Sequence, residues 1–381
     1  MALKLSPEPN TVKLIRKARQ LSSAAVAAEA KLSEELLAAV EAEYTELPKG
    51  KIVALAKALA VPTQFLFHKK LEIEENLPDF RTTANRPAIL TSAGLARVQR
   101  AKSIISYLDD EVFEGDEKPA IAGSVEIAFG IERAANALRK YYSPVKRADG
   151  SVDPSGTFRE TRVSIEKEGA IVLCDRVAND SFRGFCFSQK GLFPLILINT
   201  AAQRPATKLF TLMHEIVHVL LGRTGVSDPT LIENKVEQFC NRVTASVMMP
   251  KDAFLSVYEQ LETKSVRRVT NDLAHHFGVS KQAAAIRVSE LNLSDDFYGR
   301  WLRSLPPRVP PIEEEDEDQN ASGGGGGIAA QVGRFGYLLP HMLGKAINNR
   351  SISVLDAYRL TNLKPNTFSE LAKIGERRLE H

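Results

Sequence analysis

Three features that would place a protein in a special class are scarce in this sequence. Its three cysteines, Cys174, Cys186 and Cys240, are widely spaced, which excludes a disulfide framework and a C-x-x-C zinc site and fits a reducing compartment. No apolar run approaches the roughly twenty residues that a membrane span needs, and the first residues lack the apolar core of a signal peptide. We therefore expect a cytoplasmic protein without a membrane segment.

A strong excess of charge is also absent. The 50 basic and 47 acidic side chains give a formal net charge of +3 at pH 7, which by itself does not indicate nucleic acid as a partner. The composition is that of an ordinary globular protein, and 381 residues are enough for about two to four domains.

One stretch does carry chemistry, the H-E-x-x-H pattern formed by His214, Glu215 and His218. Apolar residues around it recur at helical spacing, so both imidazoles are expected on one helix face, a single turn apart. Each can offer a neutral ring nitrogen to zinc, while Glu215, rotated off that face, can accept a proton from a water at the metal. The pattern indicates metal-assisted hydrolysis; the alternative is a chance coincidence on a buried helix.

A catalytic zinc also needs a third protein ligand. The best source is a second apolar-periodic helix that begins near Glu237 and stops at Pro250, because loop residues separate it from the first. An antiparallel return would bring Glu237 back to the histidines. Glu233, one turn earlier, is the competing ligand, and Cys240 is a third, disfavoured because it lies nearly a turn further into the helix.

Several motifs around these residues resemble the ImmA/IrrE family of bacterial metallopeptidases. In that family an apolar strand ends in Asn, a helix reads F-T-x-x-H-E-x-x-H, and another helix reads E-x-x-x-N and closes in L-L-M-P. The matching segments are residues 195–199, 208–218, 237–241 and 245–250, within about 124–291. The resemblance implies that His214, His218 and Glu237 are metal ligands and that Glu215 is the catalytic base.

The same resemblance implies a function and a cofactor. Characterised relatives cleave helix-turn-helix repressors after stress or signals from a mobile element, so we expect a zinc-dependent endopeptidase that makes limited, regulatory cuts in such a repressor. Zn²⁺ is the expected metal, with another divalent ion such as Mn²⁺ as the alternative. A competing hypothesis is a non-proteolytic transcription regulator or antitoxin-like protein that uses the peptidase fold as a sensor. The presence of Glu215 favours catalysis, because a binding module needs no base.

Residues 1–70 resemble an Xre-type helix-turn-helix module, whose third helix would enter the major groove. Short helices are expected at residues 11–20, 22–30, 33–42 and 48–60. Ser22 and Ser33 are placed as N-caps. The recognition helix at 33–43 carries four glutamates and no Arg, Lys, Asn or Gln, so it would meet phosphates with like charge. This composition disfavours DNA binding and favours a protein-docking or dimerising role.

A helical connector is expected at 71–123, with helices at 92–108 and, beyond it, at 125–142. From residue 161 the pattern becomes strand-like. Strands are predicted at residues 161–165, 170–174, 184–187 and 195–198. In related peptidases such a sheet has an edge strand along which a substrate is laid, which would put the 195–199 region beside the metal. The alternative is a sheet that only packs beneath the helix.

The overall expectation is an α+β, mainly helical protein. A zincin-like metallopeptidase core with a small sheet at 124–261 would be flanked by helix-turn-helix-like modules. The second of these, at 262–291, is more basic and suits packing, substrate capture or DNA contact; its basic residues are Arg267, Arg268, Lys281 and Arg287. A linker rich in Pro, acidic residues and Gly at 292–327 would lead to a helical unit at 328–381 with no assigned chemistry.

Overall fold

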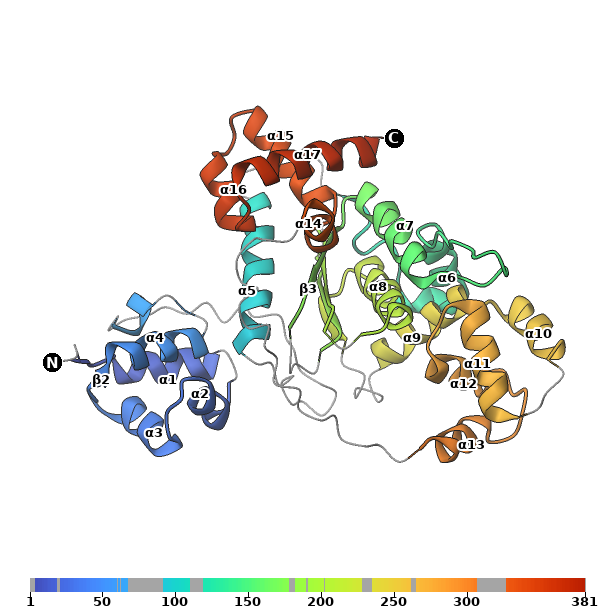
Figure 1. The fold of residues 1–381 in the computed structure, drawn as a ribbon, viewed down its shortest axis with the longest axis horizontal. Helices are drawn as coiled ribbons and strands as arrows, with labels where there is room; N and C mark the ends of the chain where they lie inside the picture. Colours follow the sequence, from blue (N-terminus) through green and yellow to red (C-terminus); the bar gives the residue numbers. More distant parts are fainter. Residues whose placement is uncertain are drawn as a thin grey trace. The chain divides into compact units, whose positions relative to one another are not determined.

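The chain folds into two compact units in the computed structural model of its 381 residues (Figure 1). Unit 1 comprises residues 1–103 and 176–182, and unit 2 comprises residues 104–175 and 183–381. The structure describes residues 4–18, 21–59, 61, 63–67, 92–109, 119–177, 182–189, 191–201, 203–227, 235–261, 265–306 and 327–380. Among the helices in these ranges, none has the length and apolar character to span a bilayer.

Unit 1 contains a bundle of short helices around its own apolar core. Its elements are β1 (Lys4–Leu5), α1 (Pro9–Ala18), α2 (Ser23–Glu29), α3 (Glu34–Ala42), β2 (Leu47–Pro48), α4 (Lys49–Ala58) and η1 (Thr63–Phe67). The four predicted helices are present with ends shifted by up to two residues. Ser22 and Ser33 accept hydrogen bonds from the backbone N–H groups of Ala25 and Leu36, which confirms both predicted N-caps. α5 (Ser92–Tyr107), also predicted, follows.

A four-stranded mixed sheet forms the centre of unit 2. Its order is β3 (Ile171–Asp175), β5 (Leu195–Asn199), β4 (Gly184–Phe187) and β6 (Gly225–Ser227). β3 is parallel to β5, whereas β4 is antiparallel to both β5 and β6. Three of the predicted strands are confirmed, but the expectation that the 195–199 strand offers an edge to substrate is wrong. β5 is hydrogen-bonded to β3 on one side and to β4 on the other. Its backbone N–H and C=O groups are therefore already paired and cannot bind an extended substrate.

The predicted strand at residues 161–165 is wrong, because these residues belong to helix α7 (Pro154–Lys167). Asp153 caps the helix by accepting hydrogen bonds from the N–H groups of Ser155 and Gly156, and Pro154 occupies the first turn. β-branched residues at 161, 163 and 165 gave the segment its strand-like alternation. In the fold, N-terminal capping and packing against α8 override that local preference.

The helix predicted at 125–142 is shorter than expected. A 3₁₀ turn, η3 (Ile127–Phe129), precedes α6 (Gly130–Arg139). Gly130 has a φ of 80°, a conformation that an α-helix cannot accommodate in its interior. The helical pattern of the sequence therefore continues across a break that only the backbone conformation reveals.

Helices cover the sheet and extend unit 2 on one side. They are α8 (Pro205–Leu220), α9 (Lys235–Met248), α10 (Lys251–Glu259), α11 (Val266–Phe277), α12 (Lys281–Glu290) and α13 (Phe297–Ser304). One apolar cluster joins α6, α8, α9, α11, α12 and the sheet. Within the predicted linker at 292–327, residues 297–304 form α13, because Phe297 and Trp301 are buried beside α12. Residues 307–326 lie outside the described part.

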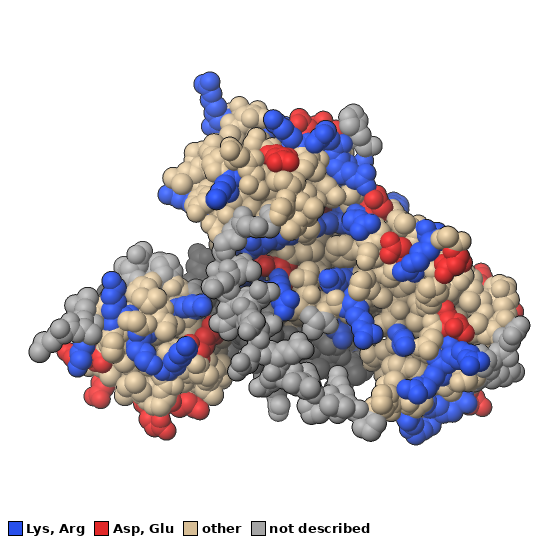
Figure 2. Space-filling model, viewed as in Figure 1, with Lys and Arg blue, Asp and Glu red and all other residues tan. Residues whose placement is uncertain are grey.

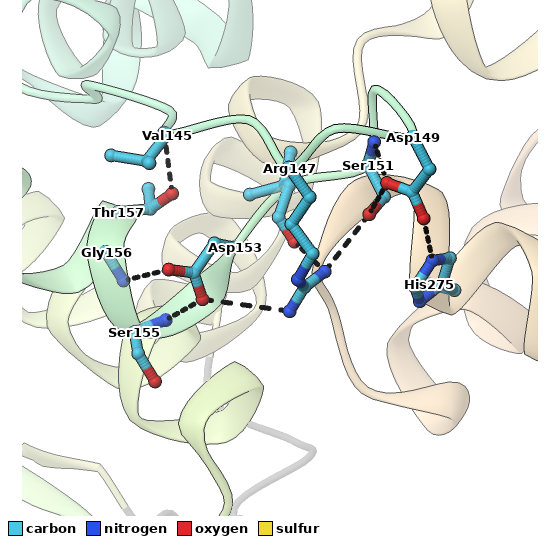
Figure 3. A network of polar contacts seen from close by, with 10 residues as sticks. Val145, Arg147, Asp149, Ser151, Asp153, Ser155, Gly156, Thr157 and His275 are labelled. Atoms are coloured by element: carbon cyan, nitrogen blue, oxygen red, sulfur yellow. Dashed lines mark hydrogen bonds and ion pairs between the residues drawn. The ribbon is translucent and has the colours of Figure 1, made fainter.

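A loop at residues 145–153 is fixed against α11 by a polar network (Figure 3). His275 Nε2 lies 2.8 Å from Asp149 Oδ2, and the Ser151 hydroxyl donates to the other oxygen of the same carboxylate at 2.6 Å. Ser151 and His275 together hold the pKa of Asp149 well below its usual range. Arg147 donates to the carbonyl of Val152 at 2.7 Å. The exposed His275 thus acts as a surface contact residue.

The C-terminal helices pack on the β3 side of the sheet. They are α14 (Ile328–Phe335), α15 (Leu338–Asn348), α16 (Val354–Thr361) and α17 (Pro365–Glu380), and α14 and α15 contact β3 while α17 contacts α7 (Figure 1). Their attachment centres on Arg162 and Glu166 of α7, a buried pair 3.3 Å apart. Arg162 donates to the Gly333 carbonyl at 2.7 Å, and Glu166 accepts from the Tyr337 N–H at 3.0 Å. The C-terminal helices therefore satisfy a charge pair that the core alone leaves incomplete.

Candidate metal centre

Helix α8 carries both histidines of the H-E-x-x-H pattern through the apolar core. It begins at Pro205, which suits the first turn because it lacks an N–H group. It ends before Gly222, whose φ of 62° lets the chain turn away. His214 and His218 are only 4 % and 2 % exposed, and Glu215 is fully buried. Three polar side chains this deeply buried require partners, because an isolated charge in such surroundings is costly.

Helix α9 packs against α8 and supplies those partners. Glu237, Cys240 and Asn241 lie at positions i, i+3 and i+4 of α9, which share one helix face. Glu237 is 6 % exposed and Cys240 is fully buried. The competing residue Glu233 lies outside the described residues.

Three potential ligands converge at this helix interface. His214 Nε2 lies 3.1 Å from Glu237 Oε2, His218 Nε2 lies 3.0 Å from Glu237 Oε1, and the two Nε2 atoms lie 3.1 Å apart. Ligand distances of about 2.0–2.1 Å around tetrahedral zinc place neighbouring donors about 3.3 Å from one another. The observed triangle is close to that size, and two imidazoles with one carboxylate are a familiar zinc donor set. The residues therefore fit a metal ion.

Asn241 orients the first of these histidines. Its side-chain oxygen lies 3.0 Å from His214 Nδ1. Because an amide oxygen can only accept, His214 Nδ1 donates to it, and Nε2 is left to face His218 and Glu237. Metal-binding histidines are generally held in this way by a hydrogen bond to the distal ring nitrogen.

The electrostatics of the centre favour an ionised carboxylate. Burial alone would raise the pKa of Glu237, but the hydrogen bonds and charges of His214 and His218 outweigh it and hold the pKa well below its usual range. Burial alone would likewise lower the pKa of His214, whereas Glu237, with Glu215 and Asn241, raises it above its ordinary value. The centre therefore pairs an ionised carboxylate with an imidazole that gains a proton more readily than usual.

Glu215 lies beside the centre and against strand β4. A methyl group at Gly184 would lie 2.9 Å from Glu215 Oε1 and 2.8 Å from Thr211 Cγ2, so the strand approaches the carboxylate as closely as only glycine permits. The charge of Glu215 contributes to the raised pKa values of both His214 and Cys240. Its carboxylate is therefore close enough to influence the centre without forming the triangle of donors.

Cys240 is nearer the centre than its position in the sequence indicated. A ring nitrogen of each histidine, His214 and His218, and the sulfur of Cys240 lie within 4.8 Å of one another, a grouping compatible with a metal ion. Burial, followed by the charges of Glu237 and Glu215, raises the pKa of the Cys240 thiol well above its ordinary value. The i, i+3 spacing of Glu237 and Cys240 puts both on one helix face, and this signal was outweighed in the prediction by the distance of Cys240 along the helix.

The basic segment at 262–291 offers a smaller charged surface than predicted. Arg287 is buried, donates to the carbonyl of Met249 and pairs with Glu290 at 3.1 Å, so it is unavailable to a partner. Arg267, Arg268 and Lys281 are exposed. Figure 2 shows Lys and Arg side chains gathered over the region of α11 and α13.

Comparison with protein-family models finds a match in the middle of the chain. Residues 165–289, about a third of the sequence, match the model of a peptidase family, M78, described as the IrrE N-terminal-like domain. The matched segment runs from the end of α7 to α12 and contains the whole centre. This match supports the resemblance to the ImmA/IrrE metallopeptidases for that segment. No curated protein matches the chain.

Proposed function

We propose that this chain is a zinc-dependent endopeptidase that makes limited, regulatory cuts in a protein partner. The observation that carries the proposal is the triangle of His214 Nε2, His218 Nε2 and the Glu237 carboxylate, with sides of 3.0–3.1 Å. It lies within the segment that matches a peptidase family. Zinc is favoured over Mn²⁺ because two imidazole donors suit the softer ion, whereas manganese prefers oxygen ligands.

Each side chain of the centre has a role in this proposal. When bound, the metal supplies Lewis acidity toward a peptide carbonyl and a water molecule. His214, His218 and Glu237 hold it, and Asn241 keeps His214 in the required tautomer. Glu215 accepts the proton of the attacking water, because its carboxylate lies at the centre yet stays outside the triangle. The close approach of Gly184 restricts where that carboxylate can point.

Glu215 provides the test of catalysis against simple metal binding. Glu215→Gln keeps the size of the side chain and removes its basicity, so the metal content should remain at about one ion per chain while cleavage is lost. His214→Ala should lose both. Metal content is measured by mass spectrometry of the purified protein, and cleavage by incubation with partner proteins. Equal loss of metal in Glu215→Gln and His214→Ala would contradict the assigned roles.

The proposed substrate is a helix-turn-helix repressor, a class of basic protein. Unit 1 presents the exposed acidic residues Glu34, Glu35 and Glu43 on α3 and its end, and Figure 2 shows acidic side chains gathered on that face. Glu41 is not free, because Arg16 pairs with it at 2.5 and 2.7 Å. An acidic face favours a basic protein partner over DNA. In this proposal the module at 1–70 docks the substrate.

Charge reversal tests docking without removing a folded unit. Glu34→Lys together with Glu35→Lys should slow cleavage of a basic repressor, mainly through KM, and leave the metal content unchanged. Glu376→Lys, an exposed position on α17, is the matched control and should have little effect. Equal rates for all three proteins, or efficient digestion of casein, would contradict docking and leave only the hydrolase.

The second hypothesis is a sensor that binds a ligand or partner and cuts nothing. The acidic residues of α3 argue against a sensor in which unit 1 binds DNA. A fully buried Glu215 beside the metal ligands favours catalysis, because a sensor gains nothing from a base in that position. A metal-loaded protein that cleaves no repressor while it changes a repressor's binding to DNA would support the sensor instead.

A further inference from the structure

The proposed hydrolase uses three protein ligands, and one more donor lies beside them. The sulfur of Cys240 and a ring nitrogen of each of His214 and His218 lie within 4.8 Å of one another. Thiolate is a preferred zinc ligand, and zinc bound by four protein side chains forms a closed site. A three-ligand hydrolytic centre has no need of this sulfur.

The position of Cys240 results from helix geometry and from burial. It follows Glu237 by three residues on α9, so both side chains face α8. Its thiol is fully buried and belongs to no disulfide. The other two free cysteines, Cys174 and Cys186, are also buried but belong to strands β3 and β4. Only Cys240 shares the helix face of a proposed ligand.

Distances define how far the sulfur must move. Zinc–sulfur and zinc–nitrogen bonds of about 2.3 and 2.0–2.1 Å place the two donors about 3.6 Å apart around a tetrahedral ion. The sulfur and the histidine nitrogens are already within 4.8 Å. A shift of about 1 Å, which a small side-chain rotation and a slight approach of α9 supply, closes the difference.

We propose that Cys240 is a reversible fourth ligand, which closes the centre formed by His214, His218 and Glu237 in the resting protein. This inference rests on the proposed function. On binding, the thiol releases its proton to solvent and the sulfur takes the fourth position; on opening, the sulfur leaves and is protonated again. A substrate carbonyl and a water then have access to the position that the sulfur leaves. The enzyme therefore rests in a latent form, and entry of the substrate into the centre favours the open one.

X-ray absorption at the zinc edge tests the resting form without any substitution. The full-length zinc protein should show one sulfur neighbour at about 2.3 Å together with nitrogen and oxygen neighbours at about 2.0–2.1 Å. A shell of nitrogen and oxygen alone, in protein that holds one zinc per chain, would overturn the proposal while leaving the proposed hydrolase intact. Failure to hold any zinc would instead contradict the metal centre itself.

Cobalt substitution identifies which cysteine is responsible. Cobalt-loaded wild-type protein should show a near-ultraviolet sulfur-to-cobalt charge-transfer band, which Cys174→Ser and Cys186→Ser should retain. Cys240→Ser should lose the band completely and still bind one cobalt ion through the three remaining ligands. If Cys240→Ser fails to fold, the X-ray absorption spectrum of the wild-type zinc protein still tests whether sulfur binds the metal. Retention of the band in folded Cys240→Ser would overturn the proposal.

Discussion

His214 Nε2 and Glu237 Oε2 lie 3.1 Å apart although 23 positions separate them in the sequence. The contact joins α8 to α9 at the centre of unit 2, and His218 completes it from one turn further along α8. Because all three side chains are buried, the contact is costly unless the charges balance. A divalent ion held by the two ring nitrogens and the carboxylate would supply the positive charge that the buried carboxylate needs.

The first prediction concerns the third ligand. Glu237→Ala should reduce metal affinity by more than the about 10- to 100-fold loss that follows when a ligand loses its hydrogen-bond partner, because it removes a direct donor. Glu233→Ala should keep the metal. Zinc content after dialysis against a graded chelator measures both. Loss in Glu233→Ala with retention in Glu237→Ala would move the ligand one turn along the chain.

The second prediction concerns orientation of His214. Asn241→Ala should weaken metal binding about 10- to 100-fold, because the ring loses the acceptor that fixes its tautomer. Asn241→Asp keeps an acceptor at the same place and should recover most of the affinity. Titration with a competing fluorescent chelator gives the metal dissociation constants of both variants. If Asn241→Ala and Asn241→Asp weaken metal binding equally, the side-chain oxygen of Asn241 does not act by orienting the His214 ring.

The third prediction concerns pH and the metal-free protein. The lowered pKa of Glu237 adds stability that is present above its ordinary value of 4.5 and is lost as pH falls through the lowered value. The raised pKa of His214 adds stability that is present below 6.5 and is lost as pH rises through the raised value. Both contributions to stability are therefore fully present between about pH 4.5 and pH 6.5. Above that window the metal-free protein should lose stability, and added zinc should raise Tm most.

Thermal melts of chelator-treated and zinc-loaded protein across pH measure this effect. Glu237→Gln is the control, since an uncharged amide removes the coupling and should flatten the difference between pH values. A metal-free wild-type protein whose pH dependence equals that of Glu237→Gln would show that the pair contributes nothing.

The fourth prediction concerns the position of Glu215. Gly184→Ala should impair cleavage while leaving metal content unchanged, because the added methyl group would lie 2.9 Å from the Glu215 carboxylate. Gly333→Ala is the matched control, since nothing lies within 4 Å of its added methyl group. Single-turnover cleavage of one substrate by both variants is the measurement. Full activity in Gly184→Ala would mean that β4 does not restrict the carboxylate.

The fifth prediction concerns the buried pair of α7. Arg162→Met should destabilise the protein by about 3–5 kcal/mol, because it leaves Glu166 charged and buried without its partner. Combining it with Glu166→Leu should recover much of the loss, since an apolar pair of similar volume removes the uncompensated charge. Urea denaturation measures both. A double variant as unstable as Arg162→Met would show that the hydrogen bonds to Gly333 and Tyr337, and not the charge balance, hold the C-terminal helices.

Local signals in the sequence were sufficient for many of the elements. Ser22 and Ser33 mark the starts of α2 and α3 because a side-chain oxygen three positions before an N–H group is a short-range feature. The period of α8 likewise needs no distant contact. The strand prediction at 161–165 is wrong because its β-branched residues alternate in a strand-like way, whereas the cap at Asp153 and packing on α8 decide its conformation.

The candidate site shows the same division. The histidine spacing on α8 and the face shared by Glu237 and Cys240 on α9 can be read from the sequence. The internal position of β5 cannot, because strand order depends on pairing between distant segments. Nor does sequence alone distinguish the buried Arg287 from the exposed Arg267, since only packing separates two arginines of one charge.

The attachment of the C-terminal helices has a consequence for how the protein is made. Arg162 and Glu166 emerge from the ribosome well before Gly333 and Tyr337, whose backbone groups lie 171 positions later and complete their hydrogen bonds. The centre on α8 and α9 is synthesised in between. A nascent chain therefore carries all proposed metal ligands before its core is complete. The buried pair of α7 therefore gains these hydrogen bonds only after α14 and the start of α15 have been synthesised.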